Sequence, residues 1–327
     1  MFNLDIILFL TTIFCYYVAA SVDLGSWVLV LLAKRSAVGD AMQATVDTYS
    51  SPFWEIINVF LVFIVVDMVA LFPSSIAILG TALLWPLGLA VLFLVLRGTA
   101  LFFGHVTQKN FFLPIHAVAG SLTVLALASI LLVSQGGFLD THLSVRFGNF
   151  LSPMAIAFFG LVVSASLYLA AHFLFWQLRT HQDQSVQKAV AQYLRVFAAL
   201  MVIFGAMWFA YLPSTSLWLA AGLAHAYNLL FVGAFFFLMS VLTHRGHKRK
   251  HWGFFYAVIG YVFFAAAYFE AHAAYLLFPL VAVAKVRIHG TLLTDLTIAS
   301  VIGLAILLPS LMILVRVFSL RERREIL

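Results

Sequence analysis

The sequence predicts an all-α polytopic membrane protein, and three observations support this fold class. Hydrophobic residues make up 64% of the 327 positions, charged residues only 9%, and the mean hydropathy is +1.08. Apolar runs of at least about 20 residues, the length of a membrane-spanning helix, recur along the whole chain. Lysine and arginine cluster at alternate ends of these runs, which is typical of cytoplasmic loops.

Nine apolar runs are long enough to cross a bilayer. Their expected limits are 4–33, 52–72, 76–103, 114–135, 152–179, 188–212, 217–243, 252–276 and 296–320. No stretch between them has the Gly/Ser or Pro richness of a flexible linker, so residues 1–327 are expected to form a single membrane domain. The first run has no basic residues before it and continues past the small residues at 18–20, which favours a retained helix over a cleaved signal peptide.

The distribution of basic residues predicts the orientation of the chain. If the N-terminus lies outside, only Arg146, Lys285 and Arg287 of the 18 lysines and arginines fall in outer loops. All the others, Arg97 among them, are then assigned to cytoplasmic ends of spans. This asymmetry indicates a multi-pass protein with an outer N-terminus and a cytoplasmic C-terminus.

The positive charge has a membrane explanation. The net charge of +6 does not indicate nucleic-acid binding, because no recognition module interrupts the apolar runs. The basic run at 244–251 is expected to anchor a cytoplasmic loop, and contact with anionic membrane lipids is the alternative.

A weak internal repeat appears when the chain is shifted by 145 positions. Residues 18–25 then lie over residues 163–170, and spans two to four lie near spans six to eight. This pattern predicts two four-helix bundles, 4–135 and 152–276, and one peripheral helix at 296–320.

Three carboxylates lie on the first two spans and are the candidate functional residues. A carboxylate costs at least ~2.5–3.5 kcal/mol at a bilayer centre, so Asp23, Glu55 and Asp67 each require a reason. With Ser51 as N-cap and Pro52 in the first turn of span two, a rise of ~1.5 Å per residue orders them Glu55, Asp23, Asp67 from the cytoplasmic side. Acids at increasing depth are typical of proton pathways.

The predicted roles of these acids differ. Desolvation is expected to keep Asp23 neutral and able to exchange a proton, while a helix N-terminus keeps Glu55 ionised. The alternative is a polar clasp between the first two spans, with Asn58 and Ser21 as the partners of Asp23.

Histidines do not form a convincing metal or haem site. His172, His225 and His272 lie at different depths in their spans, so a pair of axial haem ligands is not expected. His105 and His116 border a cytoplasmic loop and are expected to be solvated. No phosphate-binding loop, CxxC pair or nucleophile elbow is present, so no catalytic residue and no metal site are predicted in this chain.

Several motifs between residues 19 and 104 point to a family. They are Asp23-Leu24-Gly25, Pro52-Phe53-Trp54-Glu55, Asn58-Val59-Phe60-Leu61, Ala70-Leu71-Phe72-Pro73 and Leu96-Arg97-Gly98. In these motifs the chain resembles subunit II of cytochrome bd quinol oxidases. The resemblance implies a partner, subunit I, which in that family carries two b haems, haem d and the quinol-oxidation loop.

The resemblance also implies a function. The chain would be a haem-free supporting subunit of a terminal oxidase in a prokaryotic plasma membrane, and the complex would oxidise quinol and reduce dioxygen to water. Subunit II in that family contributes to proton uptake from the cytoplasm and sometimes holds a quinone, and small accessory subunits are a further open point. Asp23 and Glu55 match the acidic positions of the family.

The chain departs from the family pattern at three places. Ala20 stands where a second aspartate is usual, Glu55-Ile56 replaces an aspartate and glycine, and Val66-Asp67-Met68-Val69 replaces a glycine-rich stretch. Asp67 is therefore a candidate substitute for a lost acid.

Two other function classes remain open from the sequence. One is a proton-coupled secondary transporter, although only Pro86 and Pro309 fall well inside spans and the repeat does not relate them. The other is a stand-alone b-type cytochrome that uses the histidines.

Overall fold

The computed structural model describes residues 4–34, 37–107, 111–178, 184–243, 252–286, 293–306 and 309. The helices are α1 (Leu4–Ala33), α2 (Ala37–Leu71), α3 (Ile76–Ala82), α4 (Leu84–Thr107), α5 (Phe112–Ser134), α6 (Pro153–Gln177), α7 (Gln184–Thr215), α8 (Leu217–His225), α9 (Tyr227–Leu242), α10 (Gly253–His272) and α11 (Val283–Val286). The apolar helix Leu293–Ile306, two 3-10 helices, Pro73–Ser75 and Phe147–Leu151, and a hairpin of β1 (Tyr275–Leu277) and β2 (Val281–Ala282) complete the described elements.

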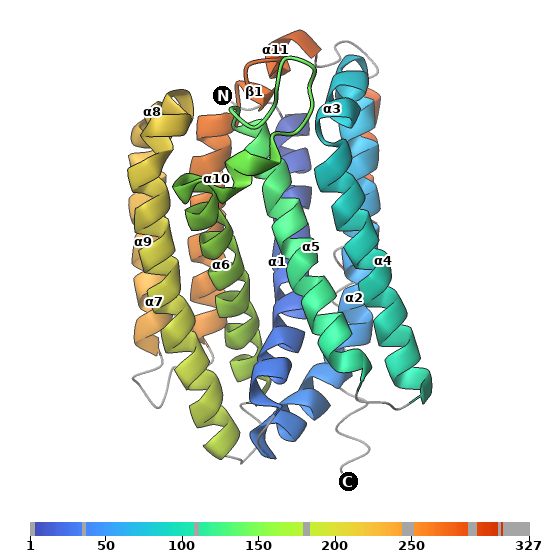
Figure 1. The fold of residues 1–327 in the computed structure, drawn as a ribbon, viewed down its shortest axis with the longest axis vertical. Coiled ribbons are helices and arrows are strands. Elements are labelled where there is room, and N and C mark those ends of the chain that lie inside the picture. Colours follow the sequence, from blue (N-terminus) through green and yellow to red (C-terminus); the bar gives the residue numbers. More distant parts are fainter. Residues whose placement is uncertain are drawn as a thin grey trace.

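Helix α1 lies in the middle of the molecule and packs on α2, α5 and α6. On one side α4 packs on α5, and on the other side α6 packs on α7 and α10 while α9 packs on α10. The long helices run side by side, and α1 begins at the top of the view (Figure 1). In the same view, the β1–β2 hairpin lies at the upper end, and the end of α1 and the start of α2 lie at the lower end (Figure 1).

The all-α membrane fold is confirmed. Within the described residues, seven helices are long and apolar enough to cross a membrane, or eight if the bent pair α8 and α9 forms one span. Of the expected ninth span at 296–320, the described part belongs to the apolar helix Leu293–Ile306, and most of the rest lies outside the described residues. The count of nine and the division into two bundles plus one helix therefore stay predictions, and the basic run at 244–251 is also outside the described part.

Helix α2 begins at Ala37 and not at the expected residue 52. Residues 37–50, which lie between the expected spans 4–33 and 52–72, have a helical period: Met42, Val46 and Tyr49 are buried, while Asp40 and Asp47 are exposed. The apolar span inside α2 is Phe53–Leu71. Since the helix already runs through Ser51, that residue is not an N-cap, and Glu55 does not lie at a helix N-terminus.

Two expected spans are broken. The expected span 76–103 consists of α3 and α4 with Leu83 between them, and the expected span 217–243 consists of α8 and α9, which meet at Ala226 with a 73° bend. Pro86 explains the first break, because a proline ring clashes with the carbonyl four residues earlier, here that of Ala82, the last residue of α3. Nothing in the sequence around Ala226 explains the second. Unbroken spans therefore cannot be used to exclude a transporter.

Helices α1 and α6 meet through residues that the 145-position shift aligns. Ser21 donates from Oγ to Ser166 Oγ over 3.2 Å, and Gly25 lies against Ala170. Small side chains at both places allow the two backbones to approach closely. The repeat itself stays a prediction.

Candidate functional site

A buried ion pair between α1 and α4 is the most unusual polar feature of the described residues. Arg97 donates from Nη2 to Asp23 Oδ2, and both side chains are 0% exposed. Each residue lies about 15 Å from the lower end of its helix at a rise of ~1.5 Å per residue, so the two charges lie at the same depth within the bilayer. Opposite charges held together cost far less in a low-dielectric interior than either charge alone.

Arg97 was expected at a cytoplasmic end of a span, and that expectation is wrong. Helix α4 continues to Thr107, about 15 Å or nearly three turns beyond Arg97, so Arg97 lies well inside the helix. The basic residue does not mark the end of the span but neutralises the acid on α1.

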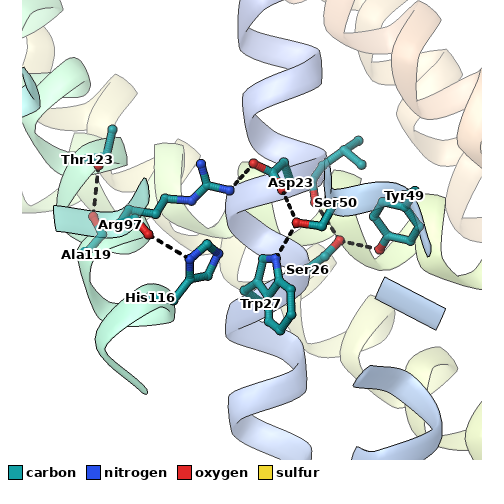
Figure 2. Close-up of polar contacts among 10 residues, drawn as sticks. Asp23, Ser26, Trp27, Tyr49, Ser50, Arg97, His116, Ala119 and Thr123 are labelled. Carbon is teal, nitrogen blue, oxygen red and sulfur yellow. Dashed lines mark hydrogen bonds and ion pairs between the residues drawn. The ribbon is translucent and has the colours of Figure 1, made fainter. Parts of the chain in front are cut away.

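The second oxygen of Asp23 is bound from α2. Ser50 donates from Oγ to Asp23 Oδ1 over 3.1 Å, and Trp27 Nε1 donates to Ser50 Oγ over 2.8 Å (Figure 2). The expected clasp partners of Asp23 were Asn58 and Ser21, and both assignments are wrong. The partners are Ser50 and Arg97.

More hydroxyl groups lie between α1 and α2 on the lower side of Asp23. Tyr49 donates to Ser26 Oγ over 2.7 Å, one turn below Asp23 on α1 (Figure 2). Further down α2, Thr48 donates to the carbonyl of Thr45 over 2.7 Å. With Ser50, these groups form the hydroxyl row, defined as Ser26, Thr45, Thr48, Tyr49 and Ser50. The sequence pattern missed it because residues 37–50, which carry most of its members, lie between the expected spans 4–33 and 52–72.

The other side of Arg97 is enclosed by aromatic side chains. Its Cζ lies 5.1 Å from the centroid of the Trp54 ring, a cation–π arrangement. Gly98 allows this packing, since a Cβ there would lie 2.8 Å from Trp54. His116 is 2% exposed, and its Nδ1 lies 3.1 Å from the Arg97 carbonyl oxygen. Its ring meets the Trp27 ring edge-on, with 4.9 Å between the ring centroids. The expectation that His116 is solvated is therefore wrong, and the side chain of His105 lies outside the described part of the chain.

Arg97 keeps unused hydrogen-bond donors. Among the described residues, no protein group accepts from its Nε or Nη1, and the buried hydroxyl of Tyr16 also has no hydrogen-bond partner there. Arginine carries five N–H donors in a fixed fork, so a guanidinium with open donors can hold Asp23 and still accommodate a second acceptor. Chemically, the site can hold a proton at the Asp23 carboxyl while Arg97 moves to another acceptor.

Glu55 and Asp67 lie away from this site. Glu55 is exposed on α2, whereas Asp67 is 4% exposed and accepts from Ser300 Oγ over 3.2 Å. Because Ser50 contacts Asp23, Glu55 lies about 7.5 Å farther along α2 than the level of Asp23. The order from the lower end is thus Asp23, Glu55, Asp67, and the predicted order with Glu55 first is wrong. None of the hydrogen bonds found in the described residues joins two of the three acids.

The three histidines within spans lie on three different helices. His172 on α6 is 1% exposed and meets Tyr168 edge-on at 4.5 Å. His225 on α8 is exposed, and its Nδ1 lies 2.7 Å from the Ala221 carbonyl oxygen. The Nε2 atom of His272 on α10 lies 3.1 Å from Ser134 Oγ. The described ranges contain no group of three or more His, Cys, Asp or Glu side chains that could hold a metal ion.

Comparison with known proteins gives one consistent result. The family model described as cytochrome bd terminal oxidase subunit II matches residues 3–318. A Bacillus subtilis (strain 168) protein named for subunit II of a cytochrome bd menaquinol oxidase is 25% identical over 335 aligned positions, which cover 96% of this chain and 94% of that protein. A chain in the structure of bd oxidase from Geobacillus thermodenitrificans is 26% identical, with a TM-score of 0.84 over 97% of this chain and 99% of that chain.

Proposed function

The chain belongs to the cytochrome bd terminal oxidase subunit II family, and we propose that within the oxidase it conducts protons from the cytoplasmic side through Asp23. Membership makes it a subunit of a quinol:dioxygen oxidoreductase complex, which favours this function over a transporter or a stand-alone b-type cytochrome. In this proposal the chain binds no haem. The haems and the site of quinol oxidation belong to subunit I.

The observation that carries the proposal is the buried ion pair of Asp23 and Arg97. A carboxylate at this depth is costly, and a merely structural contact between helices could be made without charges. The hydroxyl row lies on the lower side of Asp23, which faces the cytoplasm in the proposed orientation with the N-terminus outside. Ser50 is bonded to Asp23 and Tyr49 to Ser26, whereas the hydroxyls of Thr45, Thr48 and Ser26 donate to carbonyls of their own helices, so proton transfer along the row requires these hydroxyls to rotate. Hydroxyl groups can both donate and accept, as proton transfer along a row requires.

The proposed proton transfer uses groups of this chain only. A proton from the cytoplasmic side reaches a carboxyl oxygen of Asp23 along the hydroxyl row, and the neutral carboxyl releases Arg97 to another acceptor. Loss of that proton toward the partner subunit restores the carboxylate and the ion pair. Arg97 is a positioning residue in this scheme, since it sets the charge of Asp23 and does not carry the proton itself.

Glu55 and Asp67 are the further candidate members of the pathway. Both are on α2 and lie farther from its lower end than the level of Asp23. A proton that enters from the lower end could therefore reach them only after it has left Asp23. Glu55 faces outward and is placed to exchange a proton with a neighbouring subunit. Asp67 faces the helix Leu293–Ile306, where its hydrogen bond to Ser300 gives it a structural role as well.

The test uses one single and one double variant in the assembled complex. Asp23→Asn removes the exchangeable proton but leaves the Arg97 charge unpaired, so assembly alone could slow turnover. The double variant Asp23→Asn with Arg97→Gln removes both charges and relieves that cost. Oxygen consumption with a quinol substrate is measured beside the haem spectrum, which reports assembly. The proposal expects slow turnover in both variants at normal haem content, and turnover of the assembled double variant at the wild-type rate would overturn it.

A further inference from the structure

Ser50 is the member of the hydroxyl row that contacts Asp23, and two side chains of α1 hold it (Figure 2). Its Oγ donates to Asp23 Oδ1 over 3.1 Å and accepts from Trp27 Nε1 over 2.8 Å. Asp23 and Trp27 are four positions apart on α1, so they lie on the same side of that helix about one turn apart. A single oxygen atom on α2 is therefore bonded to both.

Trp27 fixes the direction of the Ser50 hydroxyl. An indole N–H can only donate, whereas a hydroxyl has one proton to donate and two lone pairs that accept. Because Trp27 occupies one lone pair of Ser50 Oγ, the Ser50 proton cannot point toward Trp27, and it points toward Asp23. Among the described residues, no other group donates to the second lone pair of Ser50, so a proton that arrives there has a place to bind.

The indole is itself held in place, and this distinguishes Ser50 from its neighbours in the row. Trp27 is buried, and its ring is packed edge-on against the ring of His116 from α5. The hydroxyls of Thr45 and Thr48, which have no such partner, donate to carbonyls of α2, the usual alternative for a hydroxyl on a helix. Ser50 instead keeps its proton on the side of the acid.

We propose that Ser50 is the last proton donor to Asp23, and that Trp27 is the positioning residue that holds the Ser50 hydroxyl in the donating direction. The inference rests on the proposed function of Asp23, and it adds the group that makes the final transfer and the group that orients it. In that step the Ser50 O–H bond breaks and its proton binds Asp23 Oδ1, while a proton from the cytoplasmic side binds the open lone pair of Ser50 Oγ. Ser50 is thus neutral before and after the step, and the carboxylate gains one proton. The hydroxyl turns back once Asp23 has lost its proton.

The first experiment removes only the N–H group. Benzothienylalanine, which has a sulfur atom in place of the indole N–H and nearly the same shape, replaces Trp27 in the chain coexpressed with subunit I. The matched control is the same replacement of Trp218, whose N–H donates over 3.0 Å to the Gln135 carbonyl. Oxygen consumption is measured in ordinary and in heavy water, and the haem spectrum reports assembly.

The inference expects turnover of the assembled complex to slow about two- to tenfold for position 27 only, the range that one hydrogen bond spans. The ratio of the rates in ordinary and heavy water is expected to rise, because proton transfer then limits turnover more strongly. If the bond only fastens α1 to α2, its loss lowers both rates equally and leaves the ratio unchanged. A ratio that stays at the wild-type value, or that rises equally in the control, overturns the inference whether or not turnover falls.

The second experiment asks whether Trp27 acts through Ser50. Ser50→Ala is expected to slow turnover, and the replacement at position 27 should then change nothing further, since no hydroxyl remains to be oriented. The inference is overturned if that replacement slows the Ser50→Ala variant by the same factor as the chain with Ser50, or if Ser50→Ala turns over at the wild-type rate.

The double variant Asp23→Asn with Arg97→Gln separates this inference from the proposed function. Turnover of that assembled variant at the wild-type rate ends the proposed function. Slow turnover of that variant together with a wild-type rate in Ser50→Ala ends only the inference.

Discussion

Gly25 on α1 lies so close to Ala170 on α6 that a Cβ atom on Gly25 would be 2.7 Å from the Ala170 Cβ and 3.1 Å from the Ser166 carbonyl oxygen. Ser21 and Ser166, one turn earlier on the two helices, are hydrogen-bonded, and their separation is 145 positions. Gly25 and Ala170 have the same separation. Two contacts between α1 and α6 are therefore made by residue pairs with the 145-position separation of the predicted repeat.

Replacing Gly25 by alanine should destabilise the protein. The added methyl group overlaps the Ala170 side chain and the Ser166 backbone, and overpacking of this kind typically costs about 1–3 kcal/mol. Gly88→Ala in α4 is the control, because no heavy atom lies within 4 Å of a Cβ at Gly88. Thermal unfolding of the complex in detergent measures the difference. Adding Ala170→Gly to Gly25→Ala should recover part of the loss, and equal melting of both glycine variants would contradict the close contact.

The ion pair of Asp23 and Arg97 should behave as a unit in stability measurements. Removing one partner leaves a buried charge, which typically costs about 3–5 kcal/mol, so Asp23→Leu alone and Arg97→Met alone are both expected to be strongly destabilising. The double variant removes both charges, so its loss of stability should be much smaller than the sum of the losses in the two single variants. Denaturation in detergent checks this, and additive losses would show that the two side chains do not interact.

The hydrogen bond between Ser300 and Asp67 should hold the helix Leu293–Ile306 on α2. Ser300→Ala leaves the Asp67 carboxyl without that donor in a buried place, at a cost of about 1–3 kcal/mol. Thr297→Ala is the control, because the Thr297 hydroxyl donates to the Leu293 carbonyl in its own helix. Hydrogen exchange of residues 293–306 should rise in the serine variant only. Equal exchange in both variants would remove the structural role of Asp67.

The loop between α5 and α6 should loosen in acid. The backbone N–H groups of Ser144 and His142 donate to Asp140 Oδ1, each over 2.8 Å, and hold the pKa of Asp140 below its ordinary value. A lowered pKa in the folded state means that the carboxylate stabilises the loop above its ordinary pKa, and that this contribution disappears as the pH falls through the lowered value. The amide chemical shifts of His142 and Ser144 should therefore titrate together at acidic pH. In Asp140→Asn that titration should be absent.

The spectrum of the assembled oxidase should not depend on the histidines within spans. His172, His225 and His272 lie on different helices and contact Tyr168, the Ala221 carbonyl and Ser134, so none of them is paired for axial ligation. Alanine at each position is expected to keep every haem band of a complex that assembles. Loss of one specific band from a fully assembled complex would place a haem ligand on this chain.

The sequence predicted the acid of the central site but not its partner. Asp23 stood out because any charge in an apolar run is costly. Arg97 did not, because a cation near the end of an apolar run looks the same whether the helix stops there or continues to Thr107. Only the length of α4 distinguishes the two cases.

Helix boundaries were predictable where a local signal marks them. Ser152 and Pro153 begin α6 as expected, and the Ser152 hydroxyl accepts from the Ala155 N–H. The start of α2 was missed because its first turns are amphipathic and carry Asp40 and Asp47, a composition that a search for apolar runs does not detect. The bend at Ala226 could not be predicted, because no proline lies near it in the sequence.

The ion pair also imposes an order on biosynthesis. Asp23 and Arg97 are separated by 74 positions, so at roughly 5–20 residues per second the aspartate is synthesised about 4–15 s before the arginine. During that interval α1 enters the bilayer with a carboxyl group that has no cation to neutralise it, and protonation is the least costly state. When α4 follows, its arginine meets an acid already in place. The acid on the first span is thus already present when the span that carries its cation is made.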